Sequence, residues 1–77
     1  MSNNSQGAIS AVFNKAVESS QAGDLRTAAL LLQRLTLLAP TDVGVWRALA
    51  RCHDQFGESE VAEHLRWLGQ SLAEGAQ

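Results

Sequence analysis

The sequence nearly repeats itself after 34 residues, and this internal period is the feature that most limits the fold. When the 77-residue chain is laid over itself with that offset, apolar residues fall on apolar residues, small on small, and glycine on glycine. The matched pairs are Ile9 and Val43, Val12 and Trp46, Ala16 and Ala50, Gly23 and Gly57, Ala28 and Ala62, Leu31 and Leu65, and Leu38 and Leu72. A period of this length is the signature of a repeat architecture, in which each unit buries its apolar face against a neighbour.

The first half of the chain predicts two helices separated by a glycine. Residues 8–22 and 25–38 carry apolar residues at spacings of three and four, which places them on one face of a helix. Between them, Gly23 suits a helix end and Asp24 suits the cap of the next helix. The apolar stripe predicted for the second helix consists of Leu25, Ala28, Leu31, Leu32, Leu35 and Leu38.

The second half of the chain repeats this order. Pro40 ends the second helix, because proline disfavours the helical conformation in the residue before it. A cap at Thr41 or Asp42 starts a third helix that continues to about Phe56. The acidic residues at 58–60 favour the start of a fourth helix, which continues to about residue 73.

These elements predict an all-α fold of two antiparallel helix hairpins, four helices in total, stacked on each other. No segment alternates apolar and polar residues as a strand would. We expect one helical domain over residues 8–73, with repeats at about 8–41 and 42–73 and flexible flanks at 1–7 and 74–77. A chain this short is marginally stable alone, and its single cysteine, Cys52, excludes an internal disulfide. We therefore expect another polypeptide to cover part of it.

Charge and hydropathy exclude several classes of partner. The net charge is −2 and the basic residues are spread singly, which argues against nucleic acid. The longest apolar run, 28–32, is far too short to cross a membrane, and the first residues lack the pattern of a secretory signal. The expectation is a cytoplasmic protein with no membrane insertion.

No residue pattern predicts catalysis or a metal site. Cys52, His53 and Asp54 include a nucleophile, a base and an acid, but neighbours on a helix point about 100° apart and cannot form a triad. His53 and His64 lie on different helices without a third ligand at a suitable spacing. We therefore expect no enzyme, cofactor, metal or small-molecule substrate.

The period of 34, the turn glycines, the small residues at 16, 28, 50 and 62, and the closing Pro40 together resemble the tetratricopeptide repeat. The resemblance implies a short α-solenoid whose first helices line a groove for a partner protein. Carried over position by position, the groove residues are Phe13, Val17, Ser20, Arg47, Arg51 and Gln55. Such a groove suits an amphipathic helix or an extended segment with a carboxylate. Alternatively, Phe13 and Val17 belong to the core and the arginines to a solvated face.

The fourth helix carries a narrow apolar seam. It consists of Val61, Leu65, Leu68 and Leu72 at spacings of 4, 3 and 4, with Trp67 as a possible edge. Ala62 and Gly69 form a neighbouring small-residue face that we expect to meet the third helix. The seam is interpreted as a contact with another chain; alternatively, the third helix and the N-terminus cover it.

The predicted function is a small adaptor or chaperone that binds another protein. Residues 21–50 look similar to the repeat core of type III secretion chaperones, which hold an aggregation-prone secreted subunit before export. The alternative is a structural protein that associates with a second copy of itself through the leucine seam and binds no client.

Overall fold

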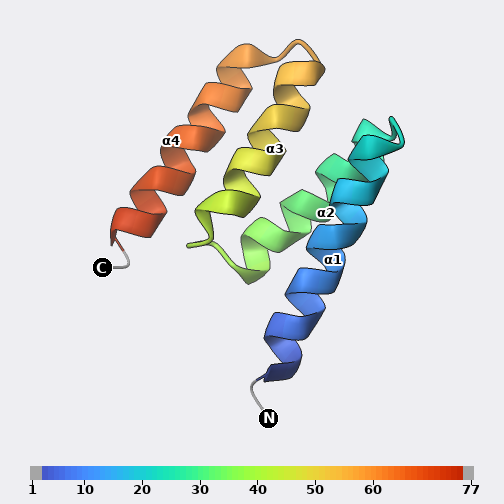
Figure 1. The fold of residues 1–77 in the computed structure, drawn as a ribbon. Coiled ribbons are helices and arrows are strands. Elements are labelled where there is room, and N and C mark those ends of the chain that lie inside the picture. Colours follow the sequence, from blue (N-terminus) through green and yellow to red (C-terminus); the bar gives the residue numbers. More distant parts are fainter. Residues whose placement is uncertain (1–2, 76–77) are drawn as a thin grey trace.

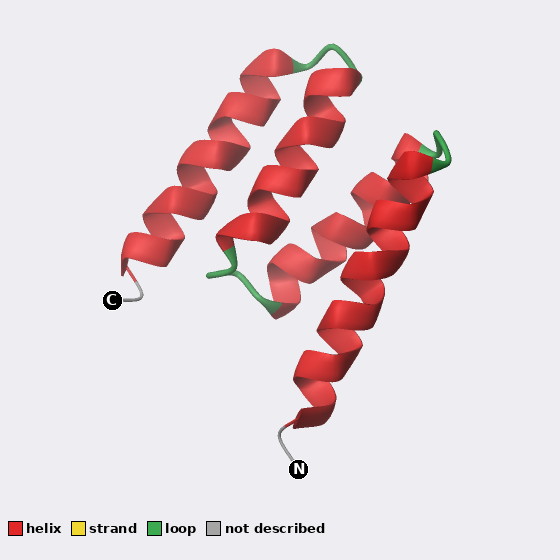
Figure 2. Ribbon diagram, in the orientation of Figure 1, coloured by secondary structure: helices red, strands yellow, loops and turns green. Residues whose placement is uncertain are grey.

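The computed structural model describes the backbone of residues 3–75 and the side chains of residues 7–75, and within that part the chain forms four helices and no strand (Figures 1 and 2). These are α1 (Asn3–Gln21), α2 (Leu25–Leu38), α3 (Val43–Gln55) and α4 (Ser59–Gly75). Each helix contacts the next one along the chain and runs antiparallel to it, so the helices form a slab of 40 × 30 × 13 Å. The all-α prediction is confirmed.

The outer helices are longer than predicted. α1 begins at Asn3 instead of residue 8, and α4 ends at Gly75 instead of residue 73. The extra residues are polar or small and follow no apolar period, so a search for such a period stops short of them. A glycine such as Gly7 costs a helix only about 1 kcal/mol and does not end it. Of the flanks expected to be flexible, residues 1–2 and 76–77 lie outside the described part.

The two hairpin turns have the same geometry, 34 residues apart. Gly23 and Gly57 have φ angles of 88° and 84°, a left-handed conformation that costs glycine no steric clash. In both turns the glycine N–H donates to the carbonyl three residues back at 3.0 Å. The next N–H donates to the carbonyl five residues back, at 2.8 Å in the first turn and 2.9 Å in the second. The backbone geometry of the turn therefore recurs after 34 residues.

The helix caps use different side chains. Asp24 accepts a hydrogen bond from the Thr27 N–H at 3.2 Å, and hydrogen bonding to Thr27 lowers the pKa of this exposed carboxyl. At the equivalent place, Glu58 instead reaches back to His53, with 2.7 Å between Oε1 and Nδ1. Of the two predicted caps of α3, Asp42 accepts a hydrogen bond from the N–H two residues on, at 3.0 Å.

Small residues allow the helices of each hairpin to approach closely, as predicted. Ala16 and Ala28 in the first hairpin, and Ala50 and Ala62 in the second, are each 1% exposed or less. Alanine buries little area for each residue, but it places two backbones near enough for their other side chains to interlock. These four alanines therefore lie at the contacts between the two helices of each hairpin.

The closest approach of α3 and α4 lies at Gly69. A Cβ atom built on Gly69 would lie 2.5 Å from the Cβ of Trp46 and 2.8 Å from its Cγ. Trp46 is held from its other side, because its indole N–H donates to the carbonyl of Pro40 at 2.8 Å. The expectation that the small-residue face of α4 meets α3 is confirmed.

The apolar stripe predicted for α2 is only partly buried. Leu32 and Leu35 belong to the core, but Leu38 is 66% exposed. Ala29, which lies outside the predicted stripe, is buried instead. The reason is that α2 packs against both α1 and α3, so its buried face is wider than one stripe and turned towards α3.

The face of α2 that packs on α3 has a polar counterpart in α4. Ala29 and Leu32 share one core cluster with residues of α3. The residues 34 positions later are Glu63 and Arg66, and both are exposed. A further hairpin stacked on α4 in the same way would bury these two charges, at a high cost in desolvation.

On its outer side, α1 likewise carries charged residues at the places where α3 carries buried apolar ones. Leu49 and Cys52 of α3 are buried in the contact with the first hairpin. Their counterparts in α1 are Lys15 and Glu18, which are exposed. Both outer faces of the two-hairpin stack are therefore polar, as capping repeats are.

Candidate functional site

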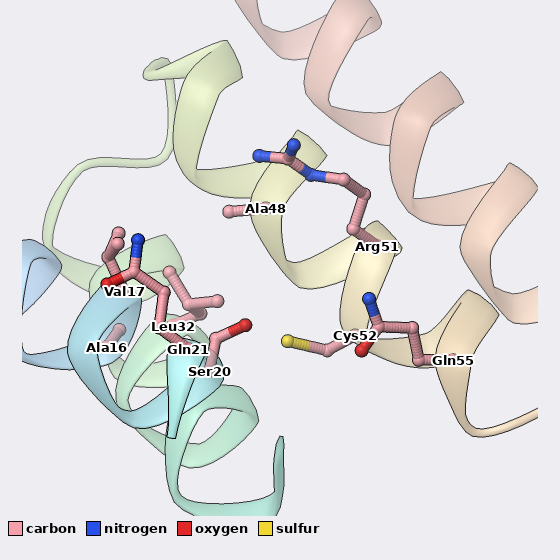
Figure 3. A pocket seen from close by; sticks show the side chains of 9 residues that line it. All are labelled: Ala16, Val17, Ser20, Gln21, Leu32, Ala48, Arg51, Cys52 and Gln55. Carbon is pink, nitrogen blue, oxygen red and sulfur yellow. The ribbon is translucent and has the colours of Figure 1, made fainter. Parts of the chain in front are cut away.

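A pocket of about 240 Å³ lies between α1 and α3, in the groove predicted from the sequence (Figure 3). The α1 wall contains Val17 and Ser20, and the α3 wall contains Ala48 and Arg51. The complete lining is Ala16, Val17, Ser20, Gln21, Leu32, Ala48, Arg51, Cys52 and Gln55. The pocket therefore combines an apolar interior with polar side chains at its rim.

Four of the six predicted groove residues meet here: Val17, Ser20, Arg51 and Gln55. Phe13 is half-buried and lies in a separate pocket of about 260 Å³ between α1 and the start of α3, beside Val45. Arg47 lies outside both pockets. The alternative that Phe13 belongs to the core holds in part, because its side chain packs against the core cluster.

Three arginines of α3 and α4 gather at one place on the surface. Arg47, Arg51 and Arg66 line one open pocket of about 510 Å³ together with Gln70. Arg66 forms an ion pair with Asp54, which joins α4 to α3. Among residues 7–75, neither Arg47 nor Arg51 has a carboxylate within 4.0 Å. Half of the six basic residues in a chain with net charge −2 thus lie together.

Sequence reasoning missed Arg66 as a member of this cluster. Arg66 interrupts the apolar pattern of α4, and this interruption was the available signal. Its association with Arg47 and Arg51 depends on how two helices are placed side by side, which spacing along one helix does not give.

Cys52, His53 and Asp54 point to three different partners. The Cys52 sulfur faces the pocket between α1 and α3, where burial raises the pKa of the thiol against the opposing effect of the Arg51 charge. His53 pairs with Glu58, and Asp54 pairs with the guanidinium on α4. Within the described residues, no three His, Cys, Asp or Glu side chains are arranged to hold a metal ion.

The predicted seam of α4 is divided between the core and the surface. Leu65 is half-buried and packs against the core cluster, and Leu68 is also half-buried. Val61 and Leu72 are 44% and 38% exposed. Trp67, the predicted edge, is 61% exposed and stacks on the ring of His64 with 5.7 Å between centroids.

The seam lies on a different side of α4 from its polar outer face. Successive residues turn by 100°, which places Glu63 and Arg66 on one side of the buried Ala62, and Val61 and Leu65 on the other. The seam is therefore not the place where a further repeat would stack, and its interpretation as a contact with another chain stays a prediction.

In comparisons with known proteins, no family model, no curated protein and no solved structure matches the chain. Across the described residues, none of the helices has the length and apolar character needed to cross a membrane. The resemblance to tetratricopeptide repeats therefore remains a prediction from the residues quoted above.

Proposed function

We propose that this chain is a small protein-binding adaptor that holds a segment of a partner protein in the groove between α1 and α3. The observation that supports this proposal most directly is the apolar pocket with Arg51 at its rim, continued by Arg47 and Arg66. At about 240 Å³ the pocket is smaller than the roughly 300–1,000 Å³ typical of small-molecule sites. Its size suits one or two side chains of a peptide segment.

The chemistry of the groove favours an amphipathic segment that carries a carboxylate. An apolar side chain of the partner would enter between Val17 and Ala48 and lose its contact with water, at about 25 cal/mol per Å² of buried apolar surface. A neighbouring Asp, Glu or C-terminal carboxylate would pair with Arg51 and Arg47. A planar guanidinium group can donate two parallel hydrogen bonds to one carboxylate. Because no described carboxylate neutralises these two arginines, they also attract an acidic segment before contact.

The client proposed from the tetratricopeptide resemblance is an aggregation-prone subunit held in the cytoplasm before secretion. In that case the mechanism is sequestration, because the groove covers the apolar face of a client helix until another protein takes it. The groove and its charges support binding of a peptide segment in general, and the identity of the client depends on the resemblance.

Co-purification of tagged chain variants from the native host tests the proposal. The double variant Arg47→Glu/Arg51→Glu reverses the groove charge, and we expect it to lose a partner that the unaltered chain retains. The matched control is Lys15→Glu, a charge reversal on the exposed outer side of α1, which should keep the partner. Alkylation of Cys52 gives a second readout, because a bound segment should slow the reaction further. A partner that binds the double variant and the unaltered chain equally would refute the proposal.

A further inference from the structure

The exposed apolar surface of this chain lies almost entirely outside the groove. Among residues 7–75, eight large apolar residues are more than a third exposed, and one of them, Val17, lines the pocket between α1 and α3. The other seven lie on α2, on α4, or at the end of α3: Leu30, Leu37, Leu38, Phe56, Val61, Trp67 and Leu72. Leu37 is 83% exposed and Trp67 is 61% exposed, so packing within the chain leaves most of both side chains uncovered.

A hollow of about 540 Å³ lies on this side of the molecule, between α2 and the turn that joins α3 to α4. Leu30 and Phe56 supply its apolar part. Arg26 and Glu58 supply opposite charges. The polar outer sides of α1 and α4 are elsewhere, so stacking of further repeats would leave this surface uncovered.

We propose that a second copy of this chain covers this surface, with α2 of each copy lying on α4 of the other. A two-fold contact requires a surface that is complementary to itself, with both signs of charge and matching apolar residues. Arg26 and Arg34 lie on the exposed part of α2, whereas Glu58 and Glu60 lie at the start of α4. A surface for an unrelated partner does not need this balance.

The 34-residue repeat fixes the register of the proposed contact. Arg26 and Glu60 occupy equivalent places on α2 and α4, and these two helices run in the same direction (Figure 1). A two-fold axis along the helices therefore places Arg26 opposite the partner's Glu60. Leu37 lies about 16 Å along α2 from Arg26, and Leu72 lies about 18 Å along α4 from Glu60, so these leucines meet at the other end.

The proposed contact has room for a stable dimer. The broad side of the slab measures 40 × 30 Å, which exceeds the roughly 800 Å² that each partner contributes to a standard interface. Its apolar residues include four leucines and a tryptophan, and buried tryptophan is enriched among the residues that dominate binding energy.

Sedimentation of the full chain over a range of concentrations tests the proposal, with thermal melts to show that each variant folds. We expect a dimer that Leu37→Glu abolishes and that Arg26→Glu or Glu60→Arg alone weakens about tenfold, because each reverses a charge at two symmetry-related places. The double variant Arg26→Glu/Glu60→Arg should restore the dimer. Val17→Glu is the matched control in the groove and should leave the dimer unchanged.

A cross-link tests the register directly. In a Cys52→Ala background, Arg26→Cys together with Glu60→Cys should form a disulfide between two chains under oxidation. A chain that stays monomeric at every concentration, or a dimer that survives Leu37→Glu, would overturn the proposal. A third outcome would also overturn it: the chain is monomeric alone and binds a different host protein, and Leu37→Glu abolishes that binding. The surface would then serve another partner. None of these results depends on the groove.

Discussion

Replacement of Gly69 by alanine should destabilise the protein, although alanine is the better helix former. Alanine in place of glycine stabilises a helix interior by about 0.8–1.0 kcal/mol. At this site, however, the new methyl group would lie 2.5 Å from the Cβ of Trp46, so α3 and α4 must move apart. Such overpacking costs typically about 1–3 kcal/mol. Rotation of the Trp46 side chain cannot relieve this clash, because the Cβ of Trp46 stays in place when its ring turns.

The net effect of Gly69→Ala is a loss of up to about 2 kcal/mol in the free energy of unfolding. For a domain of this size, each kcal/mol corresponds to roughly 4–8 °C in Tm, so a fall of up to roughly 15 °C is expected in a thermal melt followed by circular dichroism. The matched control is Gly7→Ala in α1, where a Cβ would meet nothing within 4 Å. That variant should gain up to about 1 kcal/mol. A Gly69→Ala protein with a raised Tm would refute the close approach of α3 and α4.

Three further predictions concern the core, a cap and the thiol. Leu35→Ala, at a side chain with no exposed surface, should cost about 2–5 kcal/mol and unfold much of the protein, whereas Leu37→Ala should change monomer stability by less than about 0.5 kcal/mol in urea titrations. Because the pKa of Asp24 is lowered on folding, its stabilising effect is present above the ordinary value of 3.8 and disappears as the pH falls through the folded value. The difference in Tm between the unaltered chain and Asp24→Ala should therefore shrink from pH 7 towards pH 2, and a constant difference would contradict this assignment. Cys52, 4% exposed and with a raised pKa, should react with iodoacetamide at pH 8 at least tenfold more slowly than in urea; equal rates would show an open pocket.

The fold could be predicted because each of its local signals is strong by itself. Gly23 and Gly57 mark the turns through a conformation that other residues adopt only at a cost, and the small residues mark where helices meet. The burial of Ala28 and Ala62 follows from these signals alone. The helix ends were harder to predict, because exposed polar residues can extend a helix without continuing its apolar period.

The candidate site was predicted through the tetratricopeptide resemblance. Val17 and Arg51 were carried over from it position by position, and the structure places both in the lining of one pocket. Arg66 joins the arginine cluster through the angle between α3 and α4, which the sequence does not state. Lys15 lies exposed on an outer side of the stack, where a charge belongs, and its place there follows from how the two hairpins pack.

The polar outer sides of α1 and α4 disfavour the stacking of a further hairpin on either helix, because stacking there would bury charged side chains. Within the described residues, the two hairpins bury apolar side chains against each other where α2 meets α3, so an additional hairpin would fit at that internal junction. Such an insert would need the apolar positions of α3 on one side and those of α2 on the other. A longer relative would then differ from this protein by an internal insertion between residues 38 and 43, with both of its outer helices unchanged.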